Sequence, residues 1–120
     1  MADEIQKDAE FQDKNKRFKD NMGTLCEYQL AIENYEDLSG DKTKYPSDAA
    51  AFGCLYSIRE HRKNDTWDID KLLEESEKAL ILFDKLTDEI GKEHFDFSDD
   101  GYIEYKYDYE KIQKENENGG

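Results

Sequence analysis

The side chains that most often carry nucleophilic catalysis are few in this sequence and stand far apart. It contains two cysteines, Cys26 and Cys54, and two histidines, His61 and His94. Cys54 and His61 are separated by about two turns of a helix, so their side chains cannot meet directly. The chain also lacks a glycine-rich phosphate loop and the histidine and cysteine spacings of metal sites. We therefore expect no enzyme activity and no cofactor, and we expect both cysteines to be buried thiols in a reducing compartment.

One segment carries the residue types of a calcium site. Residues 96–103 resemble the first eight positions of an EF-hand calcium loop. The oxygen ligands would be Asp96, Ser98 and Asp100, and a glycine follows at the position of the sharp bend. The last position of such a loop requires a bidentate glutamate, and Tyr107 stands there instead. A hairpin turn is the preferred interpretation, and a degenerate EF-hand-like calcium module is kept as an alternative.

Acidic residues dominate the chain and gather toward its C-terminal part. The 120 residues include 31 Asp and Glu against 17 Lys and Arg, which gives a net charge of −14. From Asp84 to Glu110 ten residues are acidic and three are basic, so half of the net charge falls there. Such a chain repels phosphate, and we expect no direct nucleic-acid binding. Because the apolar runs are too short for a membrane span or a secretory signal, we expect a cytoplasmic protein without membrane contact.

The aromatic content argues for a folded domain despite this charge. Aromatic residues make up 12% of the chain, with 8 Tyr, 6 Phe and 1 Trp. Aromatic side chains bury large areas and dominate small cores, whereas disordered acidic segments contain few of them. We expect a single domain over residues 1–120, with mobile ends at residues 1–15 and 113–120.

The first predicted helix has an apolar stripe with a seven-residue spacing. Phe11, Phe18, Leu25 and Ile32 follow one another at this interval, and the helix is expected to end near Leu38. This spacing also suits association with a partner helix or with a second copy of the chain.

Two further helices are predicted from their start and stop signals. Ser47 is the expected N-cap of the second helix, which ends near Lys63. The third helix is expected to begin at a cap formed by Thr66 or Asp68 and to end at Gly91. Its wide apolar stripe predicts contact with two neighbours, which places it at the centre of the fold.

Beyond the third helix the apolar period changes from that of a helix to that of a strand. We predict a β-hairpin with strands at residues 94–98 and 102–109. A three-residue turn would pair Phe97 with Ile103 and bring the aromatic residues to one face, with Gly101 at a positive φ. That face is expected to pack on the third helix. The predicted fold is mainly α (α+β), a three-helix bundle with a C-terminal acidic and aromatic β-hairpin.

The acidic side chains of this hairpin would project into solvent. A row of carboxylates on a rigid element resembles a nucleic-acid backbone in charge and would be steered toward a basic groove. A tyrosine among the acids would add a typical hot-spot anchor. Acidity also keeps small proteins soluble, so solubility is a competing explanation. The candidate partner-binding residues are Asp96, Asp99, Asp100, Tyr102, Glu104 and Asp108.

These features lead to a functional hypothesis and an alternative. The first is a small acidic inhibitor that occupies the basic, nucleic-acid-binding surface of a nuclease, restriction complex or CRISPR effector, as phage proteins and toxin antidotes do. The alternative is a phage or cellular assembly adaptor that binds a partner, or a second copy of itself, through its first helix. The inhibitor hypothesis predicts salt-sensitive binding, and the adaptor hypothesis does not.

Overall fold

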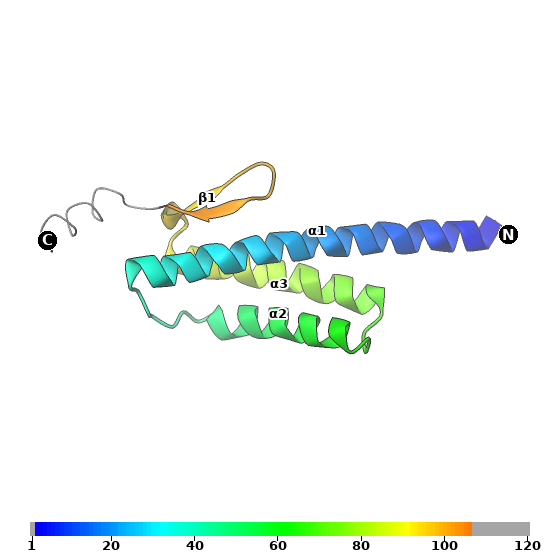
Figure 1. The fold of residues 1–120 in the computed structure, drawn as a ribbon, viewed down its shortest axis with the longest axis horizontal. Helices are drawn as coiled ribbons and strands as arrows, with labels where there is room; N and C mark the ends of the chain where they lie inside the picture. The colour runs from blue at the N-terminus through cyan, green and yellow to red at the C-terminus, as the bar shows by residue number, and fades with distance from the viewer. Residues whose placement is uncertain (1, 107–120) are drawn as a thin grey trace, which may run out of the picture.

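Three helices packed together and a C-terminal two-stranded antiparallel hairpin form the structure, as predicted (Figure 1). The computed structural model describes residues 2–106, with side chains from Ala9 onward. The predicted mobile end at residues 113–120 lies outside this range, and residues 2–15 belong to the first helix. The elements are α1 (Ala2–Ser39), α2 (Asp48–Lys63), α3 (Ile69–Ile90), the short 3-10 helix η1 (Lys92–His94), β1 (Phe95–Phe97) and β2 (Ile103–Tyr105).

Helix α1 is far longer than the two helices against which it packs. Its 38 residues correspond to about 57 Å of helix, and its N-terminal part extends beyond the ends of α2 and α3 (Figure 1). The predicted stripe is therefore buried only in part. Phe18, Leu25 and Ile32 are buried in the core, whereas Phe11 is 52% exposed.

Helix α2 starts where predicted, but its N-cap works differently from the prediction. Ser47 occupies the N-cap position without capping the helix through its side chain. Its hydroxyl donates to Oε2 of Glu89 at 2.7 Å, and its backbone N–H donates to Oε1 at 2.9 Å. Ser47 is buried against α3, so the Glu89 carboxylate accepts the hydrogen bonds that the serine N–H and hydroxyl would otherwise give to water. The negative charge also lies favourably at the N-terminus of α2.

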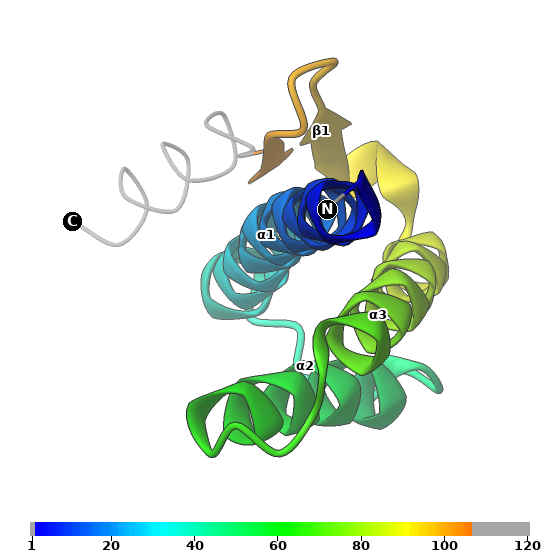
Figure 2. The same ribbon diagram turned by 90° about the vertical axis from the view of Figure 1, so that its right-hand side faces the viewer.

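Helix α3 lies between the other two helices and contacts both, which confirms its predicted central place (Figure 2). Asp68 is its cap, since Oδ1 accepts from the backbone N–H of Lys71 at 2.8 Å. Gly91 ends the helix at a φ of 117° and donates its N–H to the carbonyl of Thr87. The residues of α3 that are buried are Leu72, Leu73, Ser76, Ala79, Phe83, Leu86, Thr87 and Ile90.

The hairpin has the predicted register. Phe97 pairs with Ile103 and Phe95 pairs with Tyr105. The turn closes with a hydrogen bond from the N–H of Ser98 to the carbonyl of Tyr102 at 2.9 Å. Gly101 has a φ of 88°, as the three-residue turn requires. The strands are shorter than predicted, and residues 107–109 of the predicted second strand lie outside the described residues.

The hairpin packs mainly on α1, and the prediction that it packs on α3 was wrong (Figure 2). The ring of Tyr35 lies 5.9 Å from that of Phe95 and 5.5 Å from that of Tyr105, measured between centroids. The ring of Tyr28 lies 6.3 Å from that of Phe97. The apolar face of α3 is already covered by α1 and α2, so the outer aromatic residues of α1 receive the hairpin. Phe97 stays 43% exposed, so the aromatic face is not wholly buried.

Candidate protein-binding surface

Five of the six predicted partner-binding residues lie on the strands of the hairpin or in the turn that joins them. We call Asp96, Asp99, Asp100, Tyr102 and Glu104 the acidic hairpin face, and all five are exposed. Tyr102 is 60% exposed, so its ring is accessible to a partner. The sixth residue, Asp108, lies outside the described residues.

The acids project outward because the alternate side chains are buried. Phe95 is 2% exposed and Ile103 is 5% exposed, both against α1 and its neighbours. Successive side chains of a strand point to opposite faces, so burial of these two residues turns Asp96 and Glu104 toward solvent. The acidic hairpin face is therefore held by a packed aromatic and aliphatic base.

Most of the carboxylates on this face have no cationic partner among residues 9–106. Asp96 pairs with Lys106, with Oδ1 and Nζ separated by 3.3 Å. Asp99, Asp100 and Glu104 make no ion pair with any residue in that range. No cation in residues 9–106 neutralises their charge.

The turn holds Tyr102 beside the acids. The backbone N–H of Tyr102 donates to the hydroxyl of Ser98 at 2.9 Å, and the N–H of Gly101 donates to the carbonyl of Ser98 at 3.1 Å. A shallow hollow of about 480 Å³ lies on this surface. Its lining residues are Asp96, Phe97, Ser98, Asp100, Tyr102 and Glu104. This mixture of carboxylates and aromatic carbon suits an arginine side chain, which pairs with the acid and stacks on the ring.

Lys92 ties the hairpin to the end of α3, a contact that the sequence analysis did not predict. Its Nζ lies 2.7 Å from Oδ1 of Asp84 and 3.4 Å from Oδ1 of Asp88. The same ammonium lies 5.6 Å from the ring centroid of Phe97 and partly covers it. The hydrogen bond to Asp84 raises the pKa of Lys92, so this cation stays charged.

A tyrosine and aspartate network supports the base of the hairpin from the other side. Oδ2 of Asp41 accepts hydrogen bonds from the hydroxyls of Tyr35 at 2.6 Å and Tyr45 at 2.7 Å. Oδ1 accepts from the backbone N–H of Thr43 at 2.9 Å. Hydrogen bonds from Thr43, Tyr35 and Tyr45 lower the pKa of Asp41 well below its usual range. Because Tyr35 also contacts Phe95, the network fixes both the loop after α1 and the hairpin.

Two of the three groups considered for calcium, Ser98 and Asp96, have other contacts in the structure. The Ser98 hydroxyl accepts from the backbone of Tyr102, and Asp96 pairs with Lys106. Strand β2 (Ile103–Tyr105) covers positions 8–10 of the would-be loop and pairs with β1 in an antiparallel hairpin. Among the described residues, no group of three or more His, Cys, Asp or Glu side chains is arranged to hold a metal. Tyr107, at the last position of the loop, lies outside them.

The two cysteines are less buried than expected, and Cys54 and His61 do not contact each other. Neither cysteine is buried: Cys26 is exposed on α1 and Cys54 is half-buried on α2. Partial burial, together with the negative charge of Glu75, raises the pKa of Cys54, which disfavours the reactive thiolate. His61 stacks on Trp67 with ring centroids 3.9 Å apart, and its Nδ1 lies 2.6 Å from Oγ1 of Thr66. These contacts leave Cys54 and His61 in separate environments.

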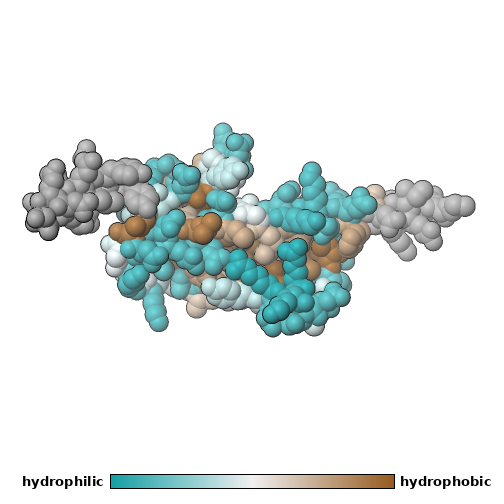
Figure 3. Space-filling view, in the orientation of Figure 1, coloured by the Kyte–Doolittle hydropathy of each residue, from teal (hydrophilic) through white to brown (hydrophobic). Residues whose placement is uncertain are grey.

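The remaining surface in the view of Figure 3 is mostly hydrophilic, with patches of apolar residues. None of the helices in residues 2–106 is long and apolar enough to cross a membrane. Comparison with protein-family models, with curated proteins and with solved structures finds no match. A functional proposal for this chain therefore rests on the geometry and charge of its own residues.

Proposed function

We propose that the protein is a small acidic inhibitor that binds a basic, nucleic-acid-binding surface of a partner through the acidic hairpin face. The observation that carries this proposal is the group of exposed carboxylates of Asp99, Asp100 and Glu104, which lack cationic partners in residues 9–106. Two of them, Asp100 and Glu104, line the same hollow as the exposed Tyr102. Solubility alone requires dispersed charge and gives no reason for an exposed tyrosine among the acids. A binding surface uses both, because carboxylates steer a basic partner and an aromatic ring anchors it.

The type of partner follows from the arrangement of charge. The acids stand on strands and a closed turn, so the backbone positions that carry them are set before binding. Fixed rows of negative charge are what nucleic-acid-binding grooves are built to accept from phosphates. A nuclease, restriction complex or CRISPR effector carries such a groove, and an occupied groove cannot bind its nucleic acid.

A second candidate function is favoured by the N-terminal part of α1. Phe11 is 52% exposed and stands three residues before Lys14, which pairs with Asp70 at the start of α3. It continues the seven-residue stripe that the rest of α1 buries within the bundle. An assembly adaptor would use this segment to bind an apolar helix of a partner or of a second copy.

The experiment measures inhibition of nucleic-acid binding in a panel of purified nucleases, restriction enzymes and CRISPR effectors. The test variant carries Asp99→Lys, Asp100→Lys and Glu104→Lys. The matched control carries Glu10→Lys, Glu60→Lys and Glu74→Lys, which change the net charge equally at exposed positions on the three helices. We expect the wild-type protein and the control to inhibit at least one enzyme, and the hairpin variant to lose this inhibition.

Two results would contradict the proposal. Equal loss of inhibition in both variants would mean that only total charge matters. If no enzyme is inhibited, and Phe11→Ser abolishes a concentration-dependent increase in mass, the adaptor function replaces the inhibitor function.

A further inference from the structure

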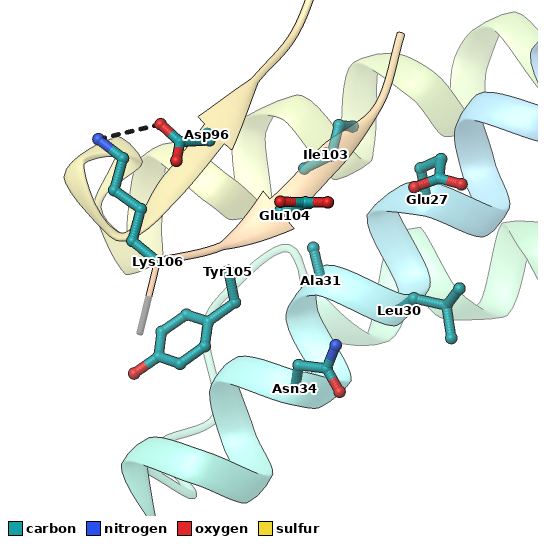
Figure 4. Close-up of a pocket in the computed structure, with 9 residues that line it drawn as sticks. All are labelled: Glu27, Leu30, Ala31, Asn34, Asp96, Ile103, Glu104, Tyr105 and Lys106. Atoms are coloured by element: carbon teal, nitrogen blue, oxygen red, sulfur yellow. Dashed lines mark ion pairs between the residues drawn. The ribbon is translucent and has the colours of Figure 1, made fainter. Parts of the chain in front are cut away.

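A groove separates the hairpin from the flank of α1, and it lies beside the acidic hairpin face (Figure 4). Its volume is about 670 Å³. Helix α1 contributes Glu27, Leu30 and Asn34, and β2 contributes Ile103, Glu104 and Tyr105. Leu30 is 55% exposed, so an apolar side chain of the groove remains open to solvent.

The hydrogen-bond pattern of the hairpin shows which way the backbone of β2 points. The N–H of Ser98 donates to Tyr102, and the N–H of Lys106 donates to His94. In an antiparallel ladder, hydrogen-bonded pairs alternate with pairs that exchange no bonds. Ile103 and Phe97 form a pair that exchanges no hydrogen bonds. The N–H and C=O of Ile103 therefore point away from β1, toward the outer edge of β2. In this two-stranded sheet, that edge borders the groove.

In an extended segment placed along this edge, apolar and basic side chains would have to alternate. Side chains of an added strand lie beside those of its neighbour on the same face. On the face toward α1 they would lie beside Ile103 and above Leu30, where apolar groups are favoured. On the opposite face they would lie beside Glu104, where cations are favoured.

The charge of the groove also favours an extended segment that carries cationic side chains. Three of its lining residues, Glu27, Asp96 and Glu104, are acidic. Lys106 is the basic residue of the lining, and its Nζ is paired with Asp96 at 3.3 Å. The groove therefore offers an apolar floor, a polar strand edge and a surplus of negative charge.

We propose that the outer edge of β2 and the flank of α1 bind an extended basic segment of the partner, with alternating basic and apolar residues, by strand addition. The proposal rests on the proposed function, because it specifies which part of a basic partner this protein engages. It adds a directional contact to the steering by charge, since backbone hydrogen bonds fix register as well as affinity.

The test uses the full chain and a blocked seven-residue peptide of alternating arginine and valine. A peptide of the same composition in block order is the control, because it matches the charge without the alternation. Affinity is measured by calorimetry, and the site is located by amide chemical shifts. We expect the alternating peptide to bind more tightly and to shift the amides of Ile103 and Leu30.

Matched apolar variants separate the groove from the acidic hairpin face. Leu30→Ser should weaken binding of the alternating peptide about tenfold, through the loss of exposed apolar contact area. Ile81→Ser should leave it unchanged, because Ile81 is 70% exposed on α3 and contributes nothing to the groove lining. The melting temperatures of both variants should match that of the wild type, since both side chains lie largely in solvent.

Several results would overturn the proposal. The strand-addition proposal would be rejected if the two peptides bound with equal affinity, or if Leu30→Ser had no effect. The acidic hairpin face would then remain as the binding surface. A mass that rises with concentration without peptide, and falls in Leu30→Ser, would assign the groove to a second copy. Binding that occurs only in a chain ending at Lys106 would assign it to residues 107–120. Tight binding of the alternating peptide without inhibition of any enzyme would uphold the groove and reject the proposed function.

Discussion

Asp96 and Glu104 lie directly opposite each other across the two strands of the hairpin. Like charges at opposite positions destabilise a sheet, and the ion pair between Asp96 and Lys106 offsets only part of this repulsion. The proposed function accounts for this pair of acids, because the outer face of the hairpin would then bind a cationic surface.

This relationship predicts that stability and binding change in opposite directions at one position. Glu104→Lys should raise the melting temperature by a few degrees, because the new cation faces Asp96. The same variant should weaken inhibition of the partner. Asp99→Lys is the control, since the turn gives it no cross-strand neighbour: inhibition should weaken while the melting temperature stays unchanged. A fall in the melting temperature of Glu104→Lys would show that the repulsion is absent.

The carboxylate of Asp41 makes stability depend on pH in the acid range. Its pKa is lowered in the folded state, so its contribution is fully present above its unfolded pKa of about 4. This contribution is lost as the pH falls through the lower folded pKa. Asp41→Asn should therefore be less stable than the wild type at neutral pH, and the difference should narrow in strong acid. Thermal unfolding across pH 2 to 7 tests this, with the exposed Asp37→Asn as control. A difference that does not change with pH would refute it.

Two glycines should respond to alanine in opposite ways. Gly23 lies within α1, and an added Cβ would meet no other atom within 4 Å. Gly23→Ala should stabilise the fold by about 1 kcal/mol through helix propensity. Gly101 has a φ of 88°, where an L side chain is strained, so Gly101→Ala should destabilise it. Urea unfolding of both variants measures the effects. Equal effects of the same sign would contradict the turn geometry.

Calcium should have little influence on the protein. The hydroxyl of Ser98 and the carboxylate of Asp96 already hold the hairpin together through Tyr102 and Lys106. Millimolar calcium and millimolar magnesium should give the same melting temperature. A rise of several degrees with calcium alone would instead support the calcium module, because a ligand that binds the folded state stabilises it.

Features with a local signal in the sequence were predictable. The change of period after Gly91 and the apolar alternation gave the register of the hairpin, because a slip of one residue would move every side chain to the other face. The outward direction of Asp96 and Glu104 followed from that register. The cap at Asp68 and the stop at Gly91 are also local devices with recognisable residue types.

Features that depend on distant residues were not predictable in this way. The choice of α1 as the support for the hairpin depends on which helix faces remain open after the bundle forms. Tyr28 and Tyr35, spaced seven apart on α1, were the signal that could have indicated it. The contact between Ser47 and Glu89 joins residues 42 positions apart, and no local pattern announces it.

In the proposed function, the acidic hairpin face binds a basic surface through many charges together. The most direct measurement is the association rate with an inhibited enzyme over a range of salt concentrations. The Debye length falls from about 10 Å at 0.1 M salt to about 3 Å at 1 M, so the rate for the wild-type protein should fall steeply. The variant with Asp99→Lys, Asp100→Lys and Glu104→Lys should associate slowly, with a much flatter dependence on salt. A flat dependence for the wild type, together with an unchanged rate for the variant, would contradict the proposed function.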